Sequence, residues 1–295
     1  MSAFDLSACT LCPRRCKADR LHRQGACGAG ESIRLARAMA HHWEEPCISG
    51  SRGSGAIFFS GCTLRCAFCQ NYNISAENFG KEVSIQRFRE ICFELKAQGV
   101  HNLNLVTPDA YAPRIVEALG EIKGELGLPI VINCGGYLSP VQIDLFSQIA
   151  DVWLPDFKYA DPALAGRLSG ASDYPEVALN AIGEMVKRVG KPAFDENGIL
   201  QKGVVVRHLV LPTARKNSID AIGMLAQRFA TDEILLSVMA QYTPNGNPAA
   251  PARRLTTFEY QSVLAEVEKA GFMGYCQSPD SAKSEYTPDF SLQGV

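Results

Sequence analysis

Three cysteines stand close together in one short segment, at Cys62, Cys66 and Cys69. Three residues separate the first pair and two separate the second, in the run GCTLRCAFCQN that begins at Gly61. Thiolates with this spacing can ligate three irons of a [4Fe–4S] cluster, for which full cysteine ligation needs a fourth thiolate. The fourth iron would then be open to a substrate, which distinguishes a reactive cluster from an electron carrier.

Two simpler uses of these thiols agree less well with the sequence. Structural zinc usually takes four tetrahedral ligands, and the next cysteine and histidine downstream are Cys92 and His101. The first residues lack the basic and apolar regions of an export signal. The eleven cysteines of an unexported chain are expected to be reduced thiols or metal ligands rather than disulfides, in a reducing cytoplasm.

The composition suits one large α/β domain, or one domain with a small appendage. The chain has 295 residues, of which 46% are hydrophobic and 20% are charged. Its formal net charge of −2 gives no reason to expect nucleic-acid binding. No apolar run approaches the ~20 residues that a membrane helix needs, so no membrane partner is expected.

Six short apolar runs alternate with segments of helical periodicity, which predicts a parallel sheet with right-handed crossovers. Because a closed barrel needs eight such units, we expect an open, partial (β/α)6 TIM-like barrel, with a doubly wound flat sheet as the alternative. The expected strands are residues 56–59, 103–106, 130–133, 152–154, 204–206 and 234–238. Helices are expected from Ser84 to Gly99, from Pro113, and from Thr256 or Thr257 to Gly271.

The chain is expected to divide into three units. Residues 1–50 form a small cysteine-rich unit, residues 51–277 form the core, and residues 278–295 lack periodicity and form a tail over the surface. Within the core, residues 156–174 are expected as a long loop. The pair Asn197-Gly198 predicts the turn of a hairpin.

In such folds the active site lies at the carboxyl ends of the strands. This rule brings the three cysteines together with residues that follow the later strands, namely Thr107, Asp109, Cys134, Gly135, Gly136, Asp156, Lys158, Arg207, Gln241 and Tyr242. Lys158 and Arg207 are cations suited to a carboxylate or to hydroxyls, with a structural ion pair as the alternative. His208 is expected to point away from Arg207, because side chains alternate along a strand.

The phrases EEPCISG, GCTLRCAFCQNYNIS, LPDFKYAD and RHLVLP carry a family resemblance over residues 41–242. The chain resembles the radical S-adenosylmethionine (SAM) superfamily. Within it, the chain is similar to the activating enzymes of glycyl-radical enzymes, notably the pyruvate formate-lyase activating enzyme. It is most similar to an uncharacterised branch named after that enzyme.

The resemblance implies that a reduced [4Fe–4S] cluster on Cys62, Cys66 and Cys69 cleaves SAM to methionine and a 5′-deoxyadenosyl radical. That radical would take hydrogen from a substrate, which for an activating enzyme is a partner protein. A one-electron donor such as flavodoxin or ferredoxin is implied as well. The alternatives are a radical SAM enzyme that acts on a small molecule or peptide, and a non-catalytic iron–sulfur redox sensor.

The expected SAM contacts are Thr107, Gly135, Gly136, Lys158 and Arg207. The glycines would let the backbone approach a nucleotide closely, with a plain turn as the alternative. The known activating enzymes carry a Gly-Gly-Glu-like turn where this chain has Thr107-Pro108-Asp109. Thr107 would serve in place of that turn. The departure from the family's turn puts a protein substrate in question.

Four further cysteines, Cys9, Cys12, Cys16 and Cys27, lie within nineteen residues near the amino terminus. Turn-forming residues stand between them, and so small a segment has little core in which to bury free thiols. They predict a second metal site, which would hold zinc, a single iron or a second iron–sulfur cluster.

The segment ahead of the first expected strand contains His41, His42, Glu44 and Glu45. Its two carboxylates could transfer protons at the barrel mouth, whereas the histidines are expected to belong to a linker anchored by Trp43. Cys92 is expected to be structural, on the apolar face of a helix.

Overall fold

The computed structural model of the protein describes residues 5–277 and 288–295. Within these residues ten strands form one sheet in the order β10-β9-β8-β6-β5-β4-β2-β1-β3, and β7 pairs with β8. The strands are β1 (Ile33–His41), β2 (Ser54–Phe59), β3 (Lys81–Val83), β4 (Leu103–Val106), β5 (Ile130–Cys134), β6 (Val152–Pro155), β7 (Ala193–Phe194), β8 (Leu200–Leu209), β9 (Leu235–Met239) and β10 (Gly274–Cys276).

The helices lie between the strands along the chain. They are α1 (Pro46–Ser49), α2 (Tyr72–Ser75), α3 (Ile85–Ala97), α4 (Ala112–Leu126), α5 (Pro140–Phe146), α6 (Pro162–Ser169), α7 (Tyr174–Val189), α8 (Arg215–Arg228) and α9 (Thr257–Ala270). Two short 3-10 turns lie at Leu6–Ala8 and Asp109–Tyr111.

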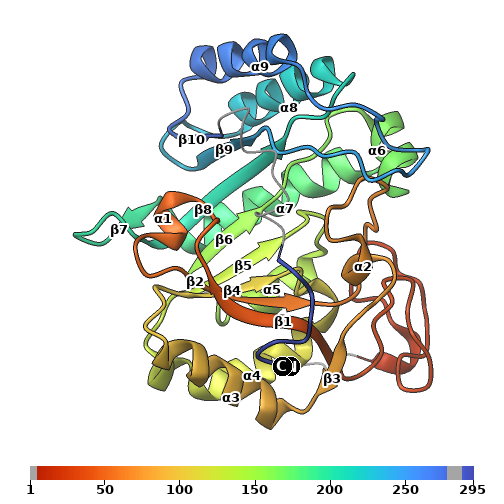
Figure 1. Cartoon of the computed structure of the whole chain (residues 1–295), viewed down its shortest axis with the longest axis vertical. Helices are drawn as coiled ribbons and strands as arrows, with labels where there is room; N and C mark the ends of the chain where they lie inside the picture. Colours follow the sequence, from red (N-terminus) through yellow and green to blue (C-terminus); the bar gives the residue numbers. More distant parts are fainter. Residues whose placement is uncertain (1–4, 278–287) are drawn as a thin grey trace.

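The six expected strands correspond to β2, β4, β5, β6, β8 and β9, and they follow one another across the sheet in chain order. All of their pairings are parallel. A doubly wound sheet would instead reverse its strand order at a switch point. Helices pack side by side along the sheet, α3 on α4, α4 on α5, α5 on α7 and α8 on α9 (Figure 1). The expected open partial barrel is confirmed, because β10 and β3 stand at opposite edges.

The expected helix ends are confirmed by their capping groups. The Ser84 hydroxyl accepts a hydrogen bond from the Arg87 backbone N–H at 3.1 Å, which starts α3. Thr256 and Glu259 form a reciprocal capping box at the start of α9, and Gly271 ends that helix in the left-handed conformation.

Alternate residues of the central strands face opposite sides of the sheet, as the pleat requires. On β5, Ile130 and Ile132 join the core beneath the helices, whereas Val131 joins an inner cluster with Val205 and Leu235. Every second residue along a strand lies on the same side of the sheet as this inner cluster. Four polar or polarisable side chains at the strand ends therefore share that side, namely Asn133, Asp156, Arg207 and Met239. The core pattern thus fixes which side chains enter the barrel.

One sequence-based expectation for the core is wrong and another is confirmed. Residues 156–174 are not simply a loop, since they contain α6, whose first turn is capped by Asp161 accepting from the Ala163 N–H at 2.8 Å. A helix of eight residues is too short to show a clear periodicity. The hairpin at Asn197-Gly198 is confirmed, because β7 runs antiparallel to β8.

The carboxyl-terminal end of the described chain lies against β1. This strand pairs with β2, and residues 288–295 lie along it, with Ala38 N–H donating to the Gln293 carbonyl at 3.0 Å. The expected surface tail falls partly on residues 278–287, which lie outside the described residues. The division into three units stays a prediction. No helix among the described residues is both long and apolar enough to cross a membrane.

Candidate functional site

A cavity of about 1260 Å³, part of it open to solvent, lies at the carboxyl ends of the parallel strands. Cys62, Cys66 and Cys69, in the loop after β2, line it together with residues from the ends of five later strands. Those residues include Thr107, Asn133, Cys134, Gly135, Asp156, Lys158, Arg207, Met239 and Gln241. The rule that gathers strand ends at one edge therefore holds here, and it brings most of the sequence-predicted residues together.

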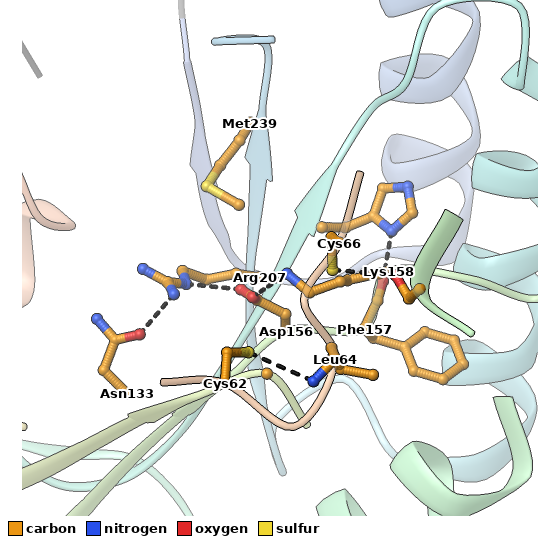
Figure 2. A network of polar contacts seen from close by, with 12 residues as sticks. Cys62, Leu64, Cys66, Asn133, Asp156, Phe157, Lys158, Arg207 and Met239 are labelled. Atoms are coloured by element: carbon orange, nitrogen blue, oxygen red, sulfur yellow. Dashed lines mark hydrogen bonds and ion pairs between the residues drawn. The ribbon is translucent and has the colours of Figure 1, made fainter. Parts of the chain in front are cut away.

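The cysteine loop is held in a tight turn after β2. Arg65 adopts a left-handed conformation with φ of 48°, and the Cys69 N–H donates to the Cys66 carbonyl at 3.1 Å. The Cys62 sulfur accepts from the Leu64 N–H at 3.4 Å (Figure 2). These contacts hold the loop so that the three sulfurs face one cavity.

Cys66 has a second anchor outside its own loop. Its sulfur accepts a hydrogen bond from the Ser169 hydroxyl at 3.0 Å, and that hydroxyl lies 2.6 Å from the Tyr159 hydroxyl. All three residues are buried. Because Ser169 belongs to α6, this bond holds the Cys66 sulfur from outside the cysteine loop.

The donor set suits an iron–sulfur cluster. Burial raises the pKa of the thiols of Cys62 and Cys69, and the neighbouring Cys66 raises both further. A positive partner would favour the thiolates of Cys62 and Cys69, and iron supplies one. No three His, Cys, Asp or Glu side chains within residues 5–277 and 288–295 already form a closed metal-binding arrangement.

Arg207 is the centre of a buried ion network beside the cysteines (Figure 2). Its Nε donates to Asp156 Oδ1 at 3.0 Å, its Nη1 to Glu44 Oε2 at 3.3 Å and its Nη2 to Asn133 Oδ1 at 2.5 Å. Lys158 Nζ pairs with the other oxygen of Asp156. The four charged side chains are only 10% to 17% exposed, so solvent screens them weakly.

The charges of this network support one another. Burial alone would raise the pKa of Asp156, but Lys158 and Arg207 hold it below its usual range. Burial works against the cations, yet Asp156 raises the pKa of both Lys158 and Arg207. These three groups therefore stay charged, and together they present two cations to a ligand.

Glu44 occupies a different electrostatic position. Burial raises the pKa of its carboxyl in spite of Arg207 and of the Asn104 amide, which donates to Glu44 Oε1 at 3.1 Å. Asn133 donates to the same oxygen at 3.3 Å. Glu44 thus joins the segment before β2 to the inner faces of β4, β5 and β8.

The Tyr174 hydroxyl ties two strand ends together from behind the cavity. It lies 2.9 Å from the Gly135 carbonyl and 2.7 Å from the Asp156 carbonyl, and it accepts from the Lys158 N–H at 3.0 Å. Gly136 must be glycine, because its φ is +76° and a Cβ would stand 2.2 Å from the Asp156 carbonyl oxygen. Gly135 lines the cavity, whereas Gly136 serves the turn behind it.

The turn after β4 is strained at Thr107. This residue has a φ of 59°, which is uncommon for a residue branched at Cβ, and its N–H donates to the Asn133 carbonyl at 2.7 Å. It lines the cavity. Asp109 follows, and burial raises the pKa of its carboxyl to about 7.

Several residues lie where the sequence predicted. His208 is buried and its Nδ1 contacts the Phe157 carbonyl at 2.6 Å, so it points away from the cavity that Arg207 lines. Cys92 is fully buried on the apolar face of α3. Gln241 lines the cavity, but Tyr242 is buried behind it against Phe68.

Sequence reasoning assigned no role to four residues of the site, Asn104, Asn133, Ser169 and Tyr174. The alternation along β4 and β5 could have found the two asparagines. No signal in the sequence marks the hydroxyls of Ser169 and Tyr174, whose partners are distant along the chain.

The amino-terminal cysteines gather beside the cysteine loop. The sulfurs of Cys16 and Cys27 each lie 3.6 Å from the point that a Cβ on Gly25 would occupy. Burial, together with neighbouring Cys27 and Cys9, raises the pKa of Cys12 to about 11, so these thiols interact electrostatically. The Cys27 carbonyl accepts from the Cys62 N–H at 2.9 Å, which joins the two cysteine groups directly.

A family model described as the Radical SAM superfamily matches residues 56–221, more than half of the chain. An uncharacterized protein of Methanocaldococcus jannaschii is 28% identical over 274 residues, which cover 88% of this chain and 74% of that protein. The 3-methylornithine synthase of Methanosarcina acetivorans is 39% identical over 85 residues, which cover 27% of this chain and 24% of the synthase.

Two solved structures share the fold. SuiB of Streptococcus suis bound to SAM has a TM-score of 0.54 at 13% identity, over 76% of this chain and 50% of SuiB. The chain thus spans about half the length of that protein. A radical SAM methyltransferase from Sphaerobacter thermophilus has a TM-score of 0.51 at 16% identity, over 95% of this chain and 87% of the methyltransferase.

Proposed function

We propose a reaction for this chain, which belongs to the radical SAM superfamily and is an enzyme of that superfamily. Its cofactors are those of the superfamily, a [4Fe–4S] cluster and SAM. We propose that Cys62, Cys66 and Cys69 hold the cluster, and that the enzyme takes a hydrogen atom from a partner protein. One observation carries this proposal: the three thiols line the same cavity as the charged ends of β6 and β8.

When bound, the reduced cluster would give one electron to SAM, and the two would thereby supply a 5′-deoxyadenosyl radical for hydrogen abstraction. The chain's own residues bind and orient. Arg207 and Lys158 present two cations, held in place by Asp156, toward the carboxylate or hydroxyls of SAM. Gly135 would let the backbone approach the nucleotide. Thr107 occupies the turn that holds the SAM amino group in the activating enzymes.

A partner protein is proposed as the substrate because the barrel is open along one side and its cavity reaches solvent. The resemblance to the activating enzymes points the same way. The second candidate is a small molecule, favoured by the local identity to 3-methylornithine synthase. A redox sensor without catalysis is disfavoured, because members of the superfamily are enzymes.

The proposed chemistry needs a reductant. We propose a one-electron donor such as flavodoxin or ferredoxin, in a reducing cytoplasm where the eleven cysteines would be reduced thiols or metal ligands. Net charge and composition give no reason to add nucleic acid or a membrane to the partners.

We further propose that Cys9, Cys12, Cys16 and Cys27 bind a second metal, as zinc, a single iron or a second iron–sulfur cluster. The approach of the Cys16 and Cys27 sulfurs to Gly25, and the hydrogen bond from Cys62 to Cys27, support a clip that steadies the cysteine loop. Metal content per chain tests this: the wild type should contain metal beyond the irons of one [4Fe–4S] cluster. A Cys12→Ser, Cys27→Ser variant should lose that excess alone, and equal metal in both proteins would contradict the site.

The nature of the substrate is tested by isotope transfer. Cells of the source organism are grown in deuterium oxide, and their desalted protein fraction and small-molecule filtrate are incubated separately with reduced, cluster-loaded enzyme and SAM. Deuterium should appear in 5′-deoxyadenosine from the protein fraction. Deuterium from the filtrate alone would overturn the protein substrate and favour the small molecule.

A further inference from the structure

A second cavity of about 810 Å³ adjoins the cysteine-lined cavity. The two share the lining residues Trp43, Glu44, Arg207, Met239 and Gln241, so they adjoin at Arg207. Met239, drawn above Arg207 in Figure 2, stands at the junction. The second cavity contains none of the three cysteines. It reaches instead to β10, through Gly274, Tyr275 and Cys276. It is therefore a side chamber of the proposed reaction site.

Glu45 lines this side chamber, and its carboxylate lacks a full set of partners. The residue is 8% exposed, and its Oε2 is buried with no hydrogen-bond partner among the described residues. Leaving such an oxygen unpaired costs free energy, so buried carboxylates normally have a donor. A ligand that donates a hydrogen bond would satisfy it.

The charges around the chamber favour a cationic donor over a neutral one. Three carboxylates line the two cavities within the described residues, those of Glu44, Glu45 and Asp156, against the cations Lys158 and Arg207. The donors of Arg207 are directed at Asp156, Glu44 and Asn133. Burial raises the pKa of the Glu45 carboxyl, so a cation placed beside it would favour its ionised form.

We propose that the side chamber binds an ammonium or guanidinium group of the substrate, with Glu45 as its carboxylate partner. The proposal rests on the proposed function, because it names a charge on the substrate of that reaction. It would place a basic side chain of the substrate on the β10 side of Arg207, with the reacting carbon on the cysteine side. Glu44 would remain with Arg207 and the asparagines.

Binding is measured by equilibrium dialysis with cluster-loaded protein in the presence of SAM. The probes are Nα-acetyl-lysine amide and Nα-acetyl-norleucine amide, which differ by the ammonium group. The lysine amide should bind at least ~10-fold more tightly, as a charge-assisted hydrogen bond in a buried site implies. Equal affinity for the two probes would overturn the proposal without the need for any variant.

Glu45→Gln tests the partner, because it keeps the shape and removes the charge. The backbone carbonyl of Glu45, which accepts from Ile48 and Ser49, is unchanged by this substitution. The preference for the lysine amide should fall to less than ~2-fold in this variant and persist in Glu268→Gln, a substitution on the exposed side of α9. A preference that survives Glu45→Gln would overturn the assignment.

Two further readouts separate the causes. Pentylamine carries the ammonium group without peptide groups. If it binds more weakly than the lysine amide, the substrate is indicated to be a polypeptide, and if the two bind equally, a free amine. 5′-Deoxyadenosine is measured in the same samples. Its formation without a preference for the lysine amide would overturn the side chamber alone. A preference for the lysine amide without 5′-deoxyadenosine would support the chamber and overturn the proposed reaction.

Discussion

The hydroxyl of Tyr174 offers a direct test of how the site is held in place. Tyr174→Phe removes one oxygen and keeps the buried ring, which stacks on Tyr137 at 6.1 Å and meets Tyr159 edge-on at 5.2 Å. The change leaves the Lys158 N–H, which donates to that oxygen at 3.0 Å, with no partner among the described residues.

The expected loss follows from two terms. An unpaired, buried backbone N–H costs about 1–3 kcal/mol, and the hydrogen bond that Tyr174 donates to the Asp156 or Gly135 carbonyl adds about 1 kcal/mol. The free energy of unfolding should therefore fall by about 2–4 kcal/mol. Tyr260→Phe is the matched control, because its buried hydroxyl donates to the Val238 carbonyl at 2.9 Å. It should cost about 1 kcal/mol.

Urea unfolding of anaerobically purified proteins, followed by circular dichroism, measures both losses. Since Tyr174 ties together the ends of β5 and β6, its variant should also lower the rate of SAM cleavage, and the Tyr260 variant should not. Equal stability losses in the two variants, or unchanged SAM cleavage in Tyr174→Phe, would refute the idea that this hydroxyl positions the site.

Other perturbations follow from the same structure. Gly136→Ala should destabilise the protein by more than about 2 kcal/mol, because the φ of Gly136 is +76° and a Cβ there would meet the Asp156 carbonyl. Gly120→Ala lies in open space on α4 and should stabilise the protein by about 0.5–1 kcal/mol. A lower melting temperature for Gly120→Ala than for Gly136→Ala would contradict this reasoning. Asp156→Asn leaves Lys158 and Arg207 buried with one carboxylate fewer and should lower the free energy of unfolding by about 3 kcal/mol. Asp232→Asn, in the exposed pair with Lys191, should have no measurable effect on urea unfolding. Arg253 and the Thr256 cap hold the pKa of Glu259 in the folded protein below its usual range. The stability that these contacts contribute is therefore fully present above the unfolded pKa of about 4.3, and it is lost as the pH falls toward the lower pKa of the folded state. The wild type should therefore lose more of its melting temperature between about pH 6 and about pH 3 than Glu259→Gln does, and equal losses would count against the cap.

The strands and the cysteine loop could be predicted because their signals are local. Each buried parallel strand is a short apolar run, such as residues 103–106, and its neighbours along the chain are also its neighbours in the sheet. The carboxyl-end rule then placed Lys158 and Arg207 in one cavity with the cysteines. The spacing of three and two residues predicts the ligand set without any knowledge of the fold.

What the sequence could not supply is pairing across long separations. Glu44 and Arg207 are 163 residues apart, and only the folded sheet brings the segment before β2 under the end of β8. Ser169 reaches Cys66 from a helix that is too short to leave a periodic pattern. The choice of partner for a hydroxyl such as that of Tyr174 depends on distances of a few tenths of an ångström, which residue types do not encode.

The most direct test of the central claim is SAM cleavage by anaerobically reconstituted protein. After reduction with dithionite and addition of SAM, we expect the wild type to release 5′-deoxyadenosine and methionine in equal amounts. A Cys66→Ala variant should release neither, while a Cys92→Ala variant, altered on the buried face of α3, should keep the activity. An intact, reducible cluster in the wild type without 5′-deoxyadenosine, or equal release by Cys66→Ala, would contradict the account.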